Sequence, residues 1–197
     1  MINRKLFSTS KLSLTMLLSA ASLASTPVLA QDLGIEVGAQ APAVTVQSLD
    51  GKQVDLGSYI GKTPMLIEFW ATWCPNCKEL MPALLDAEKR FGKKVKFVAI
   101  AVAINQSPER VRRWLAANPL PHDTYYDTQG KAAGAFDAPA TSYVVVLDKT
   151  GRVVYTGLGG KQDLEAALKK ALERSCWRLS RRPQKKEPRI NPWLFVT

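Results

Sequence analysis

The chain has 197 residues, enough for one domain with its own hydrophobic core, and its formal net charge is +10. The positive charge belongs to the two ends: residues 1–30 carry three basic residues and no acid, and residues 174–197 carry seven basic residues and one acid. Residues 31–173 hold 17 basic and 16 acidic residues and are nearly neutral. A nucleic-acid-binding domain is basic on its folded surface, so this distribution excludes nucleic acid as a partner of the folded body.

The first 30 residues are predicted to be a targeting segment and not part of the fold. Three basic residues precede or begin an apolar stretch at 12–23, and a Val-Leu-Ala segment at 28–30 places small residues where a signal peptidase acts. We predict cleavage after Ala30, which makes the mature protein periplasmic or otherwise extracytoplasmic. The alternative is a retained N-terminal membrane anchor, for which the apolar stretch is short.

The remaining chain alternates between strand and helix patterns. Strands are expected as a hairpin within 40–62 that turns at Asp50-Gly51, and as runs at 65–70, 95–104, 143–147 and 153–156. Helices are expected at 75–91, 108–117, 131–136 and 161–173, and a polar stretch through Tyr125 and Tyr126, to which no strand or helix is assigned, precedes the third of them.

This order of elements, a β-hairpin followed by β-α-β-α and then β-β-α, predicts an α/β fold. Such a fold has a small central sheet with helices on both faces. The last segment, 174–197, is rich in Arg, Lys and Pro and lacks a clear period, so we predict a basic disordered tail. The folded domain is therefore expected to span residues 31–173.

The most informative motif is Trp73-Cys74-Pro75-Asn76-Cys77, which follows the apolar strand at 65–70 and opens a predicted helix. Cys74 would lie at the helix N-terminus, where unpaired backbone N–H groups and the helix dipole favour a thiolate. Cys77 would lie one turn later on the same face, within bonding reach. A bridge that encloses two residues restrains little chain entropy, so we interpret the pair as a reversible dithiol/disulfide couple rather than a structural disulfide.

The segment from Glu68 to Lys78, with Pro82 downstream, resembles the active-site segment of the thioredoxin superfamily. Together with the leading hairpin, the targeting segment and the Asp148–Gly151 turn, it resembles the exported TlpA/ResA-like branch. The resemblance covers about residues 40–173 and implies a thioredoxin-like fold, with a central mixed sheet flanked by helices and an N-terminal β-hairpin extension.

This resemblance also implies a function. The chain would be an extracytoplasmic thiol–disulfide oxidoreductase that reduces disulfides in exported partner proteins, among them apocytochromes or copper-site cysteines. A membrane electron donor would restore the reduced Cys74–Cys77 couple, and no other cofactor or metal is expected. We expect a monomer.

Three residues are predicted to be catalytic. Cys74 is expected to be the exposed nucleophile, and Cys77 the more buried thiol that resolves the mixed disulfide. Glu68 is an acid within an apolar strand, where a carboxylate is costly. The resemblance implies that Glu68 exchanges a proton with Cys77; a glutamate at a strand edge that reaches water is the alternative.

Three further residues of the motif are predicted to contact the substrate or to tune the dithiol/disulfide couple. Trp73 is expected to form a flat apolar surface on which partner chains dock. Pro75 and Asn76 lie between the cysteines and are expected to tune the couple. Related couples span about −270 to −120 mV, so the dipeptide does not fix the direction of electron flow.

The chain departs from the family opposite the cysteines. Thioredoxin-like proteins place a cis-proline there, and counting back from the Asp148–Gly151 turn puts that position at Ser142. Either Pro139 takes this place through a shifted loop, or Thr141 and Ser142 face the cysteines without it; the second is preferred. A cis bond without proline would cost about 3 kcal/mol, which favours a trans bond.

Two other functions could use the same cysteine motif. A copper-binding chaperone could use both thiols of the motif, although only His122 and Cys176 remain as further ligands of the usual kind. A peroxiredoxin-like peroxidase is disfavoured because Ala71 stands where that family has threonine. His122 is expected to have no catalytic role, and Cys176 to be an incidental thiol in the tail or a cross-link between two molecules.

Overall fold

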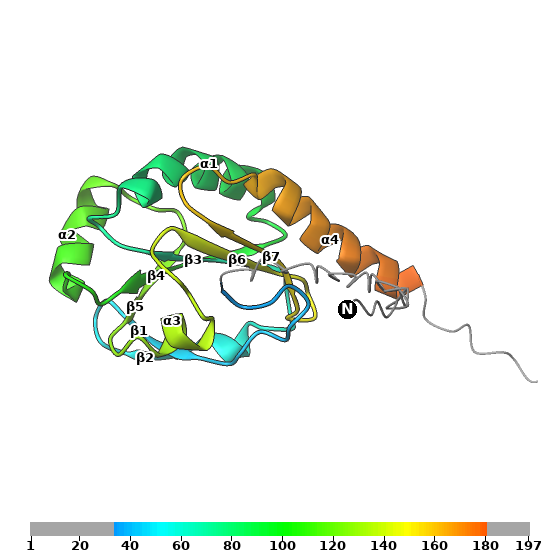
Figure 1. The fold of residues 1–197 in the computed structure, drawn as a ribbon, viewed down its shortest axis with the longest axis horizontal. Coiled ribbons are helices and arrows are strands. Elements are labelled where there is room, and N and C mark those ends of the chain that lie inside the picture. Colours follow the sequence, from blue (N-terminus) through cyan, green and yellow to red (C-terminus); the bar gives the residue numbers. More distant parts are fainter. Residues whose placement is uncertain (1–33, 181–197) are drawn as a thin grey trace, which may run out of the picture. The chain divides into compact units, whose positions relative to one another are not determined.

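The computed structural model describes the backbone of residues 34–180 and the side chains of residues 34–173. The elements of this part of the chain are drawn in Figure 1. They are β1 (Thr45–Ser48), β2 (Gln53–Asp55), the 3-10 helix η1 (Leu56–Ser58), β3 (Met65–Trp70), α1 (Pro75–Phe91), β4 (Lys96–Val102), α2 (Pro108–Ala117), β5 (Asp123–Asp127), α3 (Lys131–Ala135), β6 (Tyr143–Leu147), β7 (Val153–Leu158) and α4 (Leu164–Ser180).

The strands form one mixed sheet in the order β2-β1-β5-β4-β3-β6-β7. Strands β3, β4 and β5 are parallel to one another, whereas the β1–β2 hairpin and strands β6 and β7 are added in antiparallel pairing. The predicted α/β fold with an N-terminal hairpin extension is confirmed, because β1 and β2 extend the sheet beyond β5. The single strands predicted from the sequence are all present, and their ends differ by at most two residues.

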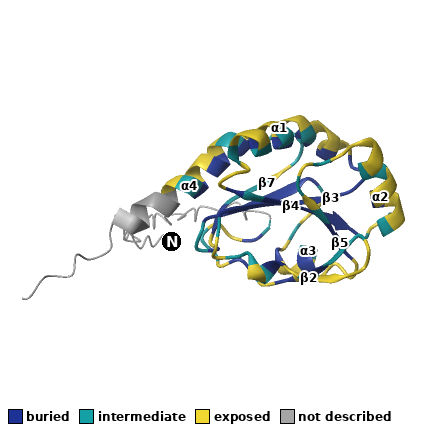
Figure 2. Cartoon of the chain, turned by 180° about the vertical axis from the view of Figure 1, so that it is seen from behind, coloured by how far each residue is buried: buried dark blue, intermediate teal, exposed yellow. Residues whose placement is uncertain are grey.

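Central strand β3 is buried along its whole length, because helices cover both faces of the sheet. Leu66 packs in one apolar cluster with Leu84 of α1 and Leu168 of α4. Ile67, the next residue, points the other way into a cluster that includes Val111 of α2. Figure 1 shows α1 and α4 along one side of the sheet and α3 on the other, and in Figure 2 the buried strands lie between helices whose outer surfaces are exposed.

Strand β5 was not predicted, because the sequence shows only a polar stretch there. Its sequence, Asp-Thr-Tyr-Tyr-Asp, has too few apolar residues to show a buried strand. The strand nevertheless pairs with β4 on one side and β1 on the other. Tyr125 and Tyr126 bury their rings, and the Tyr126 hydroxyl keeps a hydrogen-bond partner, the Gln106 carbonyl at 2.6 Å. Pairing on both edges compensates for the polar sequence.

The last helix is longer than predicted. Helix α4 continues to Ser180, so the expectation of disorder from residue 174 is wrong for the segment 174–180. No Gly or Pro interrupts this segment, and its Arg and Leu residues favour helix.

The predicted cleavage after Ala30, the rest of the tail and the Cys176 side chain lie outside the described residues. None of the helices within 34–180 has the length and apolar character that a membrane span requires.

Candidate active site

The predicted redox motif lies where strand β3 gives way to helix α1. Cys74 is the N-cap residue of α1, with extended backbone angles of φ −79° and ψ 115°, and Pro75 occupies the first turn. The Cys77 N–H donates to Cys74 Sγ at 3.0 Å. A sulfur at this position meets the positive end of the helix dipole and a free backbone donor, as the sequence predicted.

Cys74 and Cys77 form a disulfide, with their Cα atoms 5.3 Å apart. The chain is therefore described in its oxidised form. The bond joins residues within one helical turn, which agrees with the predicted dithiol/disulfide couple.

Both cysteines are buried in this form, with 2% of Cys74 and 3% of Cys77 exposed. The expectation that Cys74 is exposed is wrong for the oxidised chain, in which Cys74 caps the start of α1 and its sulfur is bonded to Cys77. Three neighbours of the cysteines, Trp73, Pro75 and Asn76, are exposed.

Glu68 lies in the middle of β3 and is only 4% exposed. Side chains alternate along a strand, so Glu68 faces the same side as Leu66, the side covered by α1. Burial raises the pKa of the Glu68 carboxyl to about 8, and no ion pair with a described residue offsets this. The alternative, a glutamate that reaches water at a strand edge, is therefore wrong; the proton exchange with Cys77 stays a prediction.

An apolar groove of about 670 Å³ opens beside the motif, and it brings together Trp73, Pro139 and Thr141. Its other walls are Val102, Ala103, Ile104, Thr128, Gln129, Gly130, Ala133, Ala138 and Ala140. None of these described residues carries a charge. The predicted docking surface at Trp73 is thus the edge of a groove, whereas Pro75 and Asn76 do not line it.

Ser142, the position at which the family has a proline, does not line this groove. It is fully buried and has a left-handed backbone conformation with φ 62°. Its N–H donates to the Phe69 carbonyl at 2.8 Å, and its hydroxyl donates to the Gly159 carbonyl at 3.0 Å. Residues 34–180 contain no cis peptide bond. Pro139 and Thr141 reach the groove and Ser142 is tied into the sheet, so any part of Ser142 in substrate recognition stays a prediction.

Gln106, which the sequence analysis did not single out, joins the motif to the loop after β4. Its Oε1 accepts the Thr72 N–H at 2.9 Å, and its Nε2 donates to the Val102 carbonyl at 2.6 Å. In the sequence, the only signal for this role is a polar residue between a buried strand and a helix. The indole N–H of Trp73 also reaches this loop, at the Ile104 carbonyl 2.8 Å away.

Thr72 is only 6% exposed, and its buried hydroxyl has no hydrogen-bond partner among the described residues. A buried hydroxyl without a partner destabilises a fold by roughly 1–3 kcal/mol. We therefore expect Thr72→Val to raise the free energy of unfolding by about 1 kcal/mol, measured by urea denaturation of the oxidised protein. Thr72→Ser, which keeps the hydroxyl, is the control, and a loss of stability in Thr72→Val would contradict the prediction.

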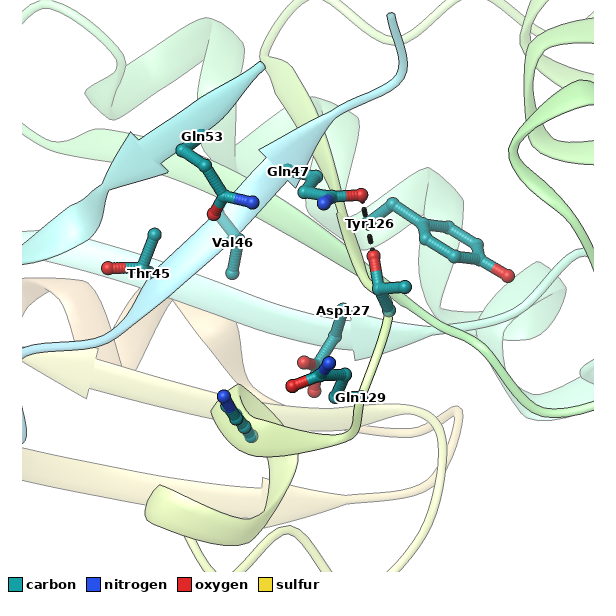
Figure 3. Close-up of a pocket in the computed structure, with 9 residues that line it drawn as sticks. Thr45, Val46, Gln47, Gln53, Tyr126, Asp127 and Gln129 are labelled. Atoms are coloured by element: carbon teal, nitrogen blue, oxygen red, sulfur yellow. Dashed lines mark hydrogen bonds between the residues drawn. The ribbon is translucent and has the colours of Figure 1, made fainter. Parts of the chain in front are cut away.

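A second, polar pocket of about 250 Å³ lies between the β1–β2 hairpin and the start of α3. Figure 3 shows Gln47 and Gln53 turned toward it, with Gln47 accepting a hydrogen bond from Thr128 at 2.7 Å. The Asp127 carboxylate beside it already accepts the N–H groups of Ala132 and Ala133. The buried Asp127 carboxylate therefore caps the start of α3, and nothing in this pocket contacts the cysteines.

His122 lies far from the motif, before β5 and at the edge of the sheet where β3 and β4 begin. Its Nδ1 lies 2.6 Å from Glu88 Oε2 in a part-buried pair. Within 34–173, no three His, Cys, Asp or Glu side chains form a cluster suited to a metal ion. His122 cannot complete a metal site with the two cysteines in this structure.

Comparison with known proteins matches the chain to the Redoxin family over residues 36–172. The chain is 30% identical to thioredoxin-like protein YneN of Bacillus subtilis strain 168, over 70% of this chain and 82% of that protein. It is also 30% identical to the thiol-disulfide oxidoreductase ResA of Bacillus thuringiensis subsp. konkukian, over 69% of this chain and 79% of the relative. A thioredoxin-family thiol:disulfide interchange protein from Chlorobium tepidum has a similar fold, with a TM-score of 0.58, 24% identity and coverage of 70% and 98% of the two chains.

Proposed function

The chain belongs to the Redoxin family and is a ResA-like thiol–disulfide oxidoreductase of the thioredoxin superfamily, and from this premise we propose that it reduces disulfides in exported partner proteins. The observation that carries the proposal is a Cys74–Cys77 disulfide at a helix N-terminus beside an uncharged apolar groove. The bond, the polarity of its surroundings and the adjacent surface are all suited to exchange with a disulfide on another chain.

The reaction needs only the two cysteines and their environment. In the reduced protein, the Cys74 thiolate attacks one sulfur of the partner disulfide, and the other partner sulfur leaves as a thiol after taking up a proton. The mixed disulfide is then attacked by Cys77, which must first lose its proton. The partner leaves as a dithiol, the chain keeps the Cys74–Cys77 disulfide, and two electrons have passed to the partner.

The helix start supplies the charge stabilisation for the first step. The Cys77 N–H that donates to Cys74 Sγ at 3.0 Å in the disulfide would donate to the same atom as a thiolate. A backbone donor and the helix dipole both favour the ionised sulfur, which lowers the pKa of the thiol. This contact supports Cys74 as the nucleophile and Cys77 as the resolving thiol.

Glu68 is the group we assign to the proton of Cys77. With its pKa raised by burial to about 8, the carboxyl is matched to a thiol, whose ordinary pKa is about 8.5. A matched acid can take a proton from Cys77 during resolution and return it when the couple is reduced again. An ordinary exposed glutamate would be too weak a base for this exchange.

The groove indicates the kind of partner. Its walls are apolar or neutral, and Trp73 and Ile104 on its rim are 38% and 62% exposed. A partner segment with apolar residues next to its cysteine would bury them here, whereas a segment with adjacent charges would have to desolvate them without compensation. The targeting pattern before residue 31 supports an exported protein as the partner, and with it a membrane electron donor for the next cycle.

The proposal is tested by trapping. In Cys77→Ala the mixed disulfide between Cys74 and a partner cannot be resolved, so we expect covalent complexes to accumulate, whereas the Cys74→Ala, Cys77→Ala double variant should form none. Non-reducing electrophoresis followed by mass spectrometry identifies the partners. An absence of complexes from extracytoplasmic extracts would contradict the proposal.

The copper-binding alternative is separated by two measurements on the purified wild-type protein. Reduction of insulin disulfides in the presence of dithiothreitol should be accelerated, and metal analysis should find no stoichiometric copper. Bound copper without turnover would favour the chaperone over the oxidoreductase.

A further inference from the structure

Both polar atoms of the Gln106 side chain make hydrogen bonds to the backbone, one to the link before α1 and one to the end of β4. Its Oε1 accepts the Thr72 N–H at 2.9 Å, from the link between β3 and α1. Its Nε2 donates to the Val102 carbonyl at 2.6 Å, at the end of β4. One side chain therefore connects the segment before the cysteine motif to the end of the neighbouring strand, β4.

The backbone of Gln106 is also held by a hydrogen bond. The Tyr126 hydroxyl of β5 donates to the Gln106 carbonyl at 2.6 Å. The Trp73 indole N–H donates to the Ile104 carbonyl at 2.8 Å, so residues 72 and 73 each donate one hydrogen bond to the loop after β4. The Thr72 hydroxyl takes no part, since it lacks a partner among the described residues.

The joined residues come directly before the reacting sulfur. Thr72 and Trp73 precede Cys74, whose N-cap conformation aims the Cys77 N–H at Sγ. The same contacts fix the position of Trp73 against Ile104, and both residues line the apolar groove. A change in this connection would therefore alter both the thiolate environment and the groove.

We propose that Gln106 is a positioning residue for disulfide exchange, which holds the segment before Cys74 so that the helix start faces the sulfur and Trp73 forms one wall of the groove. The proposal rests on the function proposed above. Gln106 does not touch the reacting atoms and acts through Thr72 and Trp73. A purely structural role would lower stability and leave the thiol chemistry unchanged.

The test uses Gln106→Met, which keeps the bulk of the side chain and removes both of its hydrogen bonds. Gln40→Met is the matched control, because the Gln40 side chain also donates to a backbone carbonyl, that of Thr150 at 3.1 Å. Thr150 lies in the β6–β7 turn, at the edge of the sheet opposite the motif. The control thus removes a similar bond where no effect on the cysteines is expected.

The first readout is the rate at which iodoacetamide alkylates Cys74 in the reduced full-length protein, followed against pH by peptide mass spectrometry that separates Cys74 from Cys77 and Cys176. We expect the midpoint of thiolate formation to move to higher pH in Gln106→Met. The alkylation rate at pH 7 should fall about fivefold, the factor that corresponds to one hydrogen bond. Gln40→Met should match the wild type.

The second readout compares two substrates. The KM for a peptide disulfide with apolar flanking residues should rise about fivefold in Gln106→Met, whereas the rate with the small disulfide reagent dithionitrobenzoate should fall only as far as the thiolate fraction does. Unchanged midpoints and KM values in a folded Gln106→Met protein would overturn the proposal, as would equal shifts in Gln40→Met. If Gln106→Met does not fold, Tyr126→Phe, which removes the bond to the Gln106 carbonyl, is judged by the same criteria.

The two proposals fail in different ways. A wild-type protein that does not reduce disulfides would overturn the proposed function, whereas alkylation of Cys74 needs no turnover and still tests Gln106. An active wild type with an unaffected Gln106→Met variant would overturn the positioning role alone.

Discussion

Cys74→Ser is expected to reduce the rate of protein-disulfide reduction to that of the uncatalysed reaction. A serine hydroxyl is not ionised near neutral pH and cannot form the mixed disulfide, so the first bond-forming step is lost. The measurement is insulin reduction followed by turbidity, with dithiothreitol as the electron source. Residual activity near that of the wild type would show that another group is the nucleophile.

Two companion variants make this result specific. Cys77→Ser retains the attacking thiol, so it should still be alkylated at Cys74 and form mixed disulfides, although it should not turn over. Cys176→Ser removes the third cysteine and should keep wild-type activity if that thiol is incidental. The stability of Cys74→Ser should change little through chain entropy, because the lost bridge encloses only two residues.

The sequence predicted best those features that are determined locally. The strand at 65–70, the helix start at Pro75 and the pairing of the two cysteines all depend on short-range patterns: an apolar run, an N-cap and a spacing of three residues. Helices α1 and α2 end where the sequence indicated, at Phe91 and Ala117.

Features that depend on distant residues were not predictable in the same way. Strand β5 exists because β1 and β4 supply partners on both edges, which its own polar sequence does not reveal. The burial of Cys74 depends on the residues packed around the start of α1, which the motif alone does not reveal. The link from Gln106 to Thr72 spans 34 residues of sequence and depends on the parallel pairing of β3 with β4.

The second large effect concerns Glu68 and the dependence of stability on pH. In the unfolded chain the Glu68 carboxyl titrates near its ordinary pKa of 4.5, whereas in the fold burial raises its pKa to about 8. Below pH 4.5 both states hold the proton and the contribution to stability is fully present. Between pH 4.5 and 8 the unfolded state loses its proton and the fold retains it, so stability falls as pH rises through this range.

We therefore expect the oxidised wild type to lose stability relative to Glu68→Gln between pH 5 and pH 8, by on the order of 4 kcal/mol. Glutamine does not ionise, so its variant lacks this component of the pH dependence, and the disulfide-bonded cysteines do not titrate in either protein. Urea unfolding at several pH values gives the difference directly. Glu173→Gln, at an exposed position near the end of the described side chains, should follow the wild type.

The same variant links stability to catalysis. If Glu68 exchanges a proton with Cys77, reduced Glu68→Gln should still be alkylated normally at Cys74, yet it should resolve mixed disulfides more slowly, most visibly below the pKa of the Cys77 thiol, where deprotonation limits the step. Rapid-mixing measurements of mixed-disulfide decay against pH separate resolution from attack. Parallel stability curves for Glu68→Gln and the wild type would contradict the raised pKa, whereas divergent curves with unchanged resolution would leave Glu68 a buried acid without a part in proton transfer.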